Sequence, residues 1–121
     1  MKTGLVIDDI EDITISVELF FQANGMEIFS SETLKEGLEI IHENNLSFIL
    51  TDLHLPNLDE NALISTLKEA TQVPIFVMTG GNKEINEFNI PEAIKKLDVS
   101  DIFIKPLDYE HMLKKITEHI D

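Results

Sequence analysis

Residues 48–56 read Phe48-Ile49-Leu50-Thr51-Asp52-Leu53-His54-Leu55-Pro56. The first four side chains are apolar or β-branched, which predicts a short buried strand over residues 48–51. Asp52 ends this run, and Pro56 begins a stretch that is typical of a loop. An Asp at a strand end often only shapes a turn or caps the next helix. In open α/β sheets, however, ligands bind at the carboxyl ends of the parallel strands, so Asp52 is also a candidate functional residue.

Four other apolar runs predict strands over residues 4–7, 26–29, 74–78 and 102–104. Apolar residues at helical spacing predict helices over residues 10–21, 34–41, 63–70 and 112–120. We expect Gly25 to end the first of these helices, and Ser30 or Ser31 to cap the start of the second. Pro106 and Asp108 introduce the last helix.

Strands and helices thus alternate along the whole chain, which predicts an α/β fold with a parallel sheet covered on both faces. The expected architecture is a single doubly wound, flavodoxin-like (βα)5 sheet with strand order 2-1-3-4-5. Residues 1–121 form one domain in this interpretation, because the chain contains no internal repeat or linker. In this order strands 1, 3, 4 and 5 can border one crevice, whereas strand 2 lies at the far edge.

The composition argues against several classes of function. The formal net charge is −14 and the sequence has no Arg, which disfavours nucleic-acid binding. It has no Cys, which excludes disulfides and thiolate metal sites. No apolar stretch is long enough to span a membrane, and the first predicted strand begins too close to Met1 for a signal peptide. We therefore expect a cytoplasmic protein that does not bind membranes.

The four predicted strands that border the crevice all end in polar or charged residues. These are Asp8 and Asp9 after the first strand, Asp52 after the third, Thr79 and Gly80 after the fourth, and Lys105 and Pro106 after the fifth. Three neighbouring carboxylates repel one another unless they bind a cation, and a ligand set made only of oxygen suits Mg²⁺. Carboxylates, a divalent ion, an ammonium and a hydroxyl together suit a phosphoryl group that one Asp oxygen attacks.

This set of residues resembles the receiver domain of two-component response regulators, which has the CheY-like fold. The resemblance implies that Asp52 is the phosphoacceptor, and that its donor is a histidine kinase or a histidine phosphotransfer protein. It also implies that Thr79 and Lys105 bind the phosphoryl oxygens. The peptide bond between Lys105 and Pro106 is expected to be cis, which is rare enough elsewhere to be a sharp prediction.

The resemblance also implies a Mg²⁺ site, at which Mn²⁺ is a possible substitute. Asp9 and Asp52 are expected to bind the ion directly, Asp8 through water, and His54 through its backbone carbonyl. The His54 side chain is not expected to bind a hard ion, although its position in similar domains modulates the hydrolysis of the aspartyl phosphate. Glu60 stands where a Gly is common, which we expect to alter the turn and not the chemistry.

Ile102 departs from the receiver pattern, because this position usually carries a Tyr or Phe that acts as a rotameric switch. Phe103 is the nearest aromatic residue, and it should point to the opposite face of the strand. Two interpretations follow. Either Ile102 simply packs in the core, or signalling uses another route.

The segment after the fourth strand is longer than is typical of receivers. Pro91 would interrupt one long helix, so we expect a long loop followed by a short helix over residues 92–97, with Pro91 as its first residue and Asn89 or Ile90 before that. Phe88 and Ile90 in this loop either pack onto the strand ends or mark a partner surface.

The leading hypothesis is a phosphorylation-controlled receiver that switches the binding of a protein effector and is not a turnover enzyme. A chain from Met1 to Asp121 favours a stand-alone or N-terminal domain, as a monomer or weak dimer, and a phosphorelay shuttle stays open. One alternative is a phosphorylation-independent adaptor that retains the fold. Another is a haloacid-dehalogenase-type aspartyl-phosphate phosphatase, although neither Asp8 nor Asp52 begins the Asp-x-Asp motif of that class.

Overall fold

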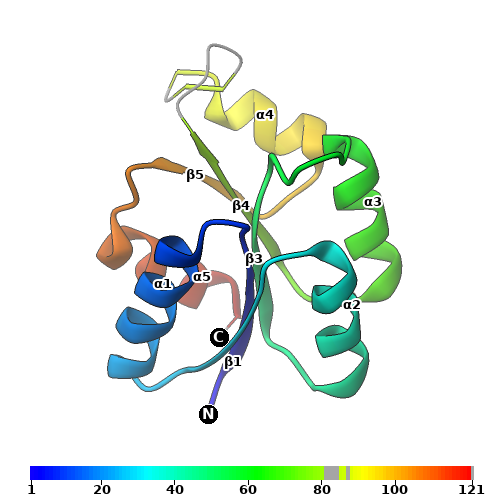
Figure 1. The fold of residues 1–121 in the computed structure, drawn as a ribbon. Coiled ribbons are helices and arrows are strands. Elements are labelled where there is room, and N and C mark those ends of the chain that lie inside the picture. Colours follow the sequence, from blue (N-terminus) through cyan, green and yellow to red (C-terminus); the bar gives the residue numbers. More distant parts are fainter. Residues whose placement is uncertain (81–84, 87, 121) are drawn as a thin grey trace.

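The computed structural model describes residues 1–80, 85–86 and 88–120 (Figure 1). Within these residues, strands and helices alternate along the chain. Their bounds are β1 Thr3–Ile7, α1 Glu11–Ala23, β2 Glu27–Ser31, α2 Leu34–Glu43, β3 Phe48–Asp52, α3 Glu60–Ala70, β4 Ile75–Gly80, α4 Ile90–Leu97, β5 Asp101–Lys105 and α5 Tyr109–Ile120. In the described part of the chain, no helix combines the length and the apolar character that a bilayer crossing requires.

The strands form one parallel sheet in the order β2-β1-β3-β4-β5, which confirms the predicted flavodoxin-like topology. The register brings the carboxyl ends of the inner strands into step. Asp52 at the end of β3 lies beside Met78 of β4, and Gly80 at the end of β4 lies beside Lys105 of β5. The ends of β1, β3, β4 and β5 therefore share one edge of the sheet.

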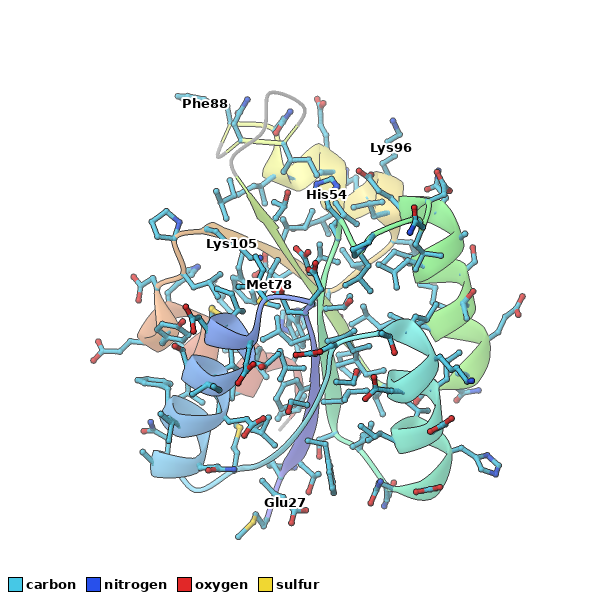
Figure 2. All side chains as sticks on the ribbon, in the orientation of Figure 1. Glu27, His54, Met78, Phe88, Lys96 and Lys105 are labelled. Carbon is cyan, nitrogen blue, oxygen red and sulfur yellow. The ribbon has the colours of Figure 1, made fainter. Side chains whose placement is uncertain are left out.

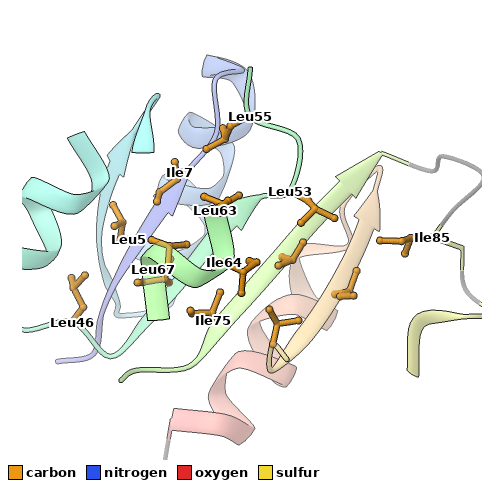
Figure 3. Close-up of a cluster of buried hydrophobic side chains, with 14 residues drawn as sticks. Leu5, Ile7, Leu46, Leu53, Leu55, Leu63, Ile64, Leu67, Ile75 and Ile85 are labelled. Carbon is orange, nitrogen blue, oxygen red and sulfur yellow. The ribbon is translucent and has the colours of Figure 1, made fainter. Parts of the chain in front are cut away.

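Helices α1 and α5 cover one face of the sheet, and α2, α3 and α4 cover the other (Figure 1). Consecutive strand residues alternate between the two cores, so that Ile49 packs toward α3 whereas Leu50 packs toward α1 and α5. Figure 3 shows the core between the sheet and helices α2, α3 and α4, where Leu63 and Leu67 of α3 lie over the strands. Each such buried side chain stabilises the folded state by about 1.5–3 kcal/mol relative to an exposed one. The packed core therefore fixes the positions of the strand ends.

Gly4 is required where β1 meets β3. A Cβ atom at this position would lie 2.2 Å from the ring of Phe48, which is far inside contact distance. The Phe48 ring also packs edge-on against Phe76 at a centroid separation of 6.2 Å. The missing side chain at Gly4 thus makes room for an aromatic row across the α1–α5 face.

The first helix ends as predicted, but the predicted cap of the second helix is wrong. Gly25 follows the end of α1 with φ of 85°, a left-handed conformation that favours glycine. Ser30 and Ser31 lie instead in β2, which runs two residues further than expected. Thr33 caps α2, since its side chain accepts a hydrogen bond from the backbone N–H of Glu36. Its hydroxyl also lies 3.3 Å from the Glu36 carboxylate, and the Thr-x-x-Glu spacing, which is the sequence signature of a helix start, could have revealed this cap.

The fourth helix is short, as the position of Pro91 predicted. It spans Ile90–Leu97, with Pro91 in its first turn and Asn89 before it, so it begins one residue before Pro91, the expected first residue. The predicted long loop falls largely on residues 81–84 and 87, which lie outside the described residues. The two flanking apolar residues behave differently: Ile90 packs against the core, whereas the Phe88 side chain is 91% exposed.

Ile102 and Phe103 point to opposite faces of β5, as predicted. Ile102 is 3% exposed and packs in the core on the α2–α4 side, whereas Phe103 packs in the core on the α1–α5 side. Phe103 stacks on Phe76 at a centroid separation of 6.0 Å. Ile102 is therefore a packed core residue, in agreement with the simpler of the two interpretations.

Candidate functional site

The predicted site residues gather at the edge where the strands end. Figure 2 shows His54 and Lys105 toward this edge, at the end of the sheet opposite Glu27. Asp8 and Asp52 directly follow or end buried strands, and both are themselves buried, with exposed fractions of 0% and 5%. Because strands β1 and β3 are neighbours in the sheet, the two carboxylates lie side by side.

Asp8, Asp9 and Asp52 form a carboxylate cluster. One carboxylate oxygen from each of these residues lies within 4.8 Å of the others. Asp9 is exposed, so the cluster opens to solvent on one side. A compact set of oxygen ligands with one open side fits Mg²⁺, which binds through one or two carboxylates and retains several waters. The residues present therefore fit the predicted metal, and a bound divalent ion would neutralise negative charge at this edge.

Lys105 is the cation of the cluster. Its Nζ lies 2.9 Å from Oδ2 of Asp8 and 3.4 Å from Oδ1 of Asp52, and the Lys105 side chain is only 18% exposed. The other carboxylate oxygen of Asp8 accepts a hydrogen bond of 2.9 Å from the backbone N–H of Ile10. Asp8 is thus held between the start of α1 and Lys105. The predicted cis bond between Lys105 and Pro106 is confirmed.

The electrostatics of the cluster reflect burial and crowding of like charge. Burial and the neighbouring Asp8 charge raise the pKa of Asp52, although Lys105 and His54 act in the opposite direction. Burial disfavours the charged form of Lys105, but its hydrogen bond to Asp8 and the charges of Asp52 and Asp8 outweigh this effect and raise the pKa of the ammonium. Lys105 therefore stays charged at neutral pH, and it favours the ionised form of Asp52 against the effect of burial.

Thr79 occupies the end of β4 and is fully buried. Its Oγ1 lies 3.2 Å from Nε2 of His54 and 3.2 Å from the carbonyl oxygen of Gly80. The other ring nitrogen of His54, Nδ1, lies 3.3 Å from Oε1 of Glu60. His54 was predicted to lie at the site, but the contact of Glu60 with its ring was not, because Glu60 was interpreted only as a turn residue.

The comparisons with known proteins agree with this geometry. The family model for the response regulator receiver domain matches residues 5–117. The chain is 27% identical over 112 residues to the transcriptional regulatory protein SrrA of Staphylococcus aureus, an alignment that covers 93% of this chain and 45% of SrrA. The chain thus spans less than half the length of this relative.

Two solved structures are similar in both fold and sequence. The beryllofluoride-activated NtrC4 receiver domain dimer has a TM-score of 0.82 and 27% identity, with 99% of this chain and 97% of that chain covered. A response regulator from Burkholderia pseudomallei, solved with a phosphorylated aspartic acid, a calcium ion and citrate, has a TM-score of 0.79 and 26% identity, with 96% and 66% covered. With the fold, the carboxylate cluster and the family match in agreement, this chain belongs to the response regulator receiver domain family.

Proposed function

We propose that this chain accepts a phosphoryl group on Asp52 from a histidine kinase or a histidine phosphotransfer protein, and that phosphorylation switches the binding of a protein effector. One observation carries the proposal. A buried carboxylate at the end of β3 lies within one cluster with two further carboxylates and a lysine ammonium. Asp9 and Asp52, with Asp8 through water and the His54 carbonyl, are the proposed Mg²⁺ ligands.

In the proposed reaction, a carboxylate oxygen of Asp52 attacks the phosphorus atom of the donor. The bond from phosphorus to the donor imidazole nitrogen breaks and its electron pair stays on that nitrogen, so the donor leaves as a neutral imidazole whose other ring nitrogen already carries the proton. Lys105 is placed to neutralise charge on the phosphoryl oxygens, since its Nζ already contacts Asp52. The hydroxyl of Thr79 donates a hydrogen bond to a phosphoryl oxygen once it turns toward the site. The divalent ion supplies the remaining positive charge.

Acetyl phosphate with Mg²⁺ tests this proposal without a cognate kinase. Intact-mass measurement should detect one phosphoryl adduct on the parent and none on Asp52→Asn. Asp12→Asn is the matched control, because Asp12 is an exposed acid in the first turn of α1. An adduct that persists in Asp52→Asn, or a parent that gains none with Mg²⁺, would contradict the proposed role of Asp52.

A phosphorylation-independent adaptor is the second candidate, and the presence of Ile102 in place of an aromatic residue favours it. The usual aromatic switch is replaced here by an aliphatic side chain that is 3% exposed. The candidates differ in their response to a phosphoryl analogue. The parent and Asp52→Asn are titrated with beryllofluoride and Mg²⁺ and followed by ¹⁹F NMR. A bound beryllofluoride signal with the parent and not with Asp52→Asn supports the receiver, whereas no bound signal with either protein supports the adaptor.

We propose further that the domain acts in the cytoplasm, as a monomer or weak dimer, and that it binds proteins and not nucleic acids. Its net charge of −14 opposes contact with a phosphate backbone. We do not assign it turnover of other phosphate esters. Catalytic hydrolysis of p-nitrophenyl phosphate by the purified chain would revive the phosphatase alternative.

A further inference from the structure

Three polar side chains form a line from the start of α3 to the end of β4. Oε1 of Glu60 lies 3.3 Å from Nδ1 of His54, and Nε2 of His54 lies 3.2 Å from Oγ1 of Thr79. The side chains of His54 and Glu60 are 39% and 33% exposed, whereas Thr79 is fully buried. The line therefore connects a half-exposed carboxylate to a buried hydroxyl at the phosphoryl site.

The order of donors along this line follows from the chemistry of its two ends. A carboxylate can only accept hydrogen bonds, so the Nδ1 atom that faces Glu60 must carry the ring proton when the imidazole is neutral. The Nε2 atom is then an acceptor, and the hydroxyl of Thr79 is the donor of the bond to His54. That hydroxyl has a single proton, for which the Gly80 carbonyl oxygen, also at 3.2 Å, is the alternative acceptor.

This arrangement conflicts with the binding of a phosphoryl group. Phosphoryl oxygens are acceptors, so Thr79 must offer its proton to them and withdraw it from His54. We infer that Glu60 and His54 are positioning residues that hold the Thr79 hydroxyl away from the phosphoryl group in the unphosphorylated protein. This inference rests on the proposed function. It assigns to His54 and Glu60 the role of opposing activation by phosphorylation.

Replacing the ring by one without nitrogens tests the inference. His54→Phe should bind beryllofluoride in the presence of Mg²⁺ about fivefold more tightly than the parent, which is the equivalent of one net hydrogen bond that no longer has to break. ¹⁹F NMR titration measures the affinity. His42→Phe is the matched control, because His42 is an exposed residue in the last turn of α2. Unchanged or weaker binding by His54→Phe would overturn the inference.

A double-mutant cycle separates this mechanism from a general effect of the substitution. Thr79→Val removes the hydroxyl and keeps the shape of the side chain, so His54→Phe should have no further effect on affinity in that background. A fivefold gain that persists without the Thr79 hydroxyl would show that His54 acts by another route and would overturn the inference.

Glu60 is tested through the tautomer of His54, a readout that needs no phosphoryl analogue. At about pH 8.5, where ordinary imidazoles are neutral, ¹⁵N NMR of the ring should show the proton on Nδ1 in the parent. Glu60→Gln should shift population toward the Nε2–H form, because an amide can also donate to Nδ1. Glu92→Gln, in the first turn of α4, is the control and should leave the tautomer unchanged. A parent ring protonated on Nε2 would overturn the inference.

The failure of the proposed function would look different. In that case the parent would bind no beryllofluoride with Mg²⁺ and would match Asp52→Asn, which would overturn both proposals. Failure of the inference alone would leave a parent that binds the analogue and His54 variants that bind it no better.

Discussion

Two lysine–aspartate pairs lie at opposite ends of the strands, one at the carboxyl ends and one at the amino ends, and they differ in burial. Lys105 contacts Asp8 where the strands end, and the two side chains are 18% and 0% exposed. Lys68 contacts Asp98 where β4 and β5 begin, and those side chains are 37% and 87% exposed. Both pairs join the same two residue types. Burial is the first difference that makes the Lys105–Asp8 pair part of a site, because a buried charge must be compensated whereas an exposed one is solvated by water.

The two edges also differ in how many like charges they crowd together. Asp9 and Asp52 cluster with Asp8, and Lys105 contacts two of these three acids, Asp8 and Asp52. Burial, and after it the Asp8 charge, raise the pKa of Asp52, and the excess of carboxylates over ammonium groups favours the binding of a cation here. Lys68 and Asp98, in contrast, balance each other one to one. The comparison predicts different responses of the two edges to mutation, metal and pH.

The largest effect on stability is expected for Lys105→Met in the absence of divalent ions. This change leaves the buried carboxylate of Asp8 without its ammonium partner, and breaking a buried pair in this way lowers the free energy of unfolding by about 3 kcal/mol. Urea denaturation at neutral pH measures the loss. Lys68→Met is the matched control, and an equal loss in both variants would contradict the contrast between the edges.

Addition of Mg²⁺ should stabilise the parent through the acidic edge. Binding only to the folded state adds about 2.7 kcal/mol to the free energy of unfolding at a free concentration one hundred times Kd. Thermal melts with and without EDTA measure the effect. Asp9→Asn should weaken it strongly, whereas Asp12→Asn should not. A parent whose melting temperature is indifferent to Mg²⁺ would show that the three acids do not form a metal site.

The pH dependence of stability should reveal the raised pKa of Asp52. Without metal, the folded state holds the Asp52 proton more tightly than the unfolded state, so stability falls as pH rises from about 3.9, the ordinary pKa of Asp, through the raised folded value. Asp52→Asn lacks this loss. It should therefore be more stable than the parent at neutral pH, and the difference should vanish below the window.

Urea midpoints of Asp52→Asn and parent across this pH range in EDTA give the measurement. Asp12→Asn again serves as the control. A variant that is less stable than the parent at neutral pH would contradict the direction of the shift.

The smallest effect is expected for Lys68→Met. An exposed ion pair contributes about 0–1 kcal/mol, and this one should also weaken as salt screens it. Measured in the same urea series, a loss as large as that of Lys105→Met would mean that exposure does not separate the two pairs.

The sequence was sufficient to predict the sheet and the gathering of its charged residues. Strict alternation predicts a parallel sheet, and five strands fit the flavodoxin-like order. Parallel strands in that order bring Asp8, Asp52 and Lys105 to one edge. The opposite orientation of Ile102 and Phe103 follows from the twofold repeat of a strand. These features depend on the spacing of apolar residues along the chain, which can be read from the sequence.

The line from Glu60 through His54 to Thr79 could not be predicted in the same way. It depends on the path of the loop between β3 and α3, where Asn57 adopts φ of 60°, and on the rotamer of His54. Neither is encoded by a periodic pattern. The prediction of the α2 cap failed for a different reason. Several neighbouring hydroxyl residues could cap this helix, and only Thr33 has Glu36 three residues later as a partner for its hydroxyl.

The proposed function requires a covalent bond between phosphorus and one carboxylate oxygen of Asp52. Borohydride reduces an aspartyl phosphate to homoserine, so treatment of the chain after incubation with acetyl phosphate and Mg²⁺, followed by peptide mass mapping, identifies the modified residue. We predict homoserine at Asp52 and at no other acid of the cluster. Homoserine at Asp8 or Asp9 instead, or an unmodified Asp52 under conditions in which a known receiver domain is labelled, would contradict the account.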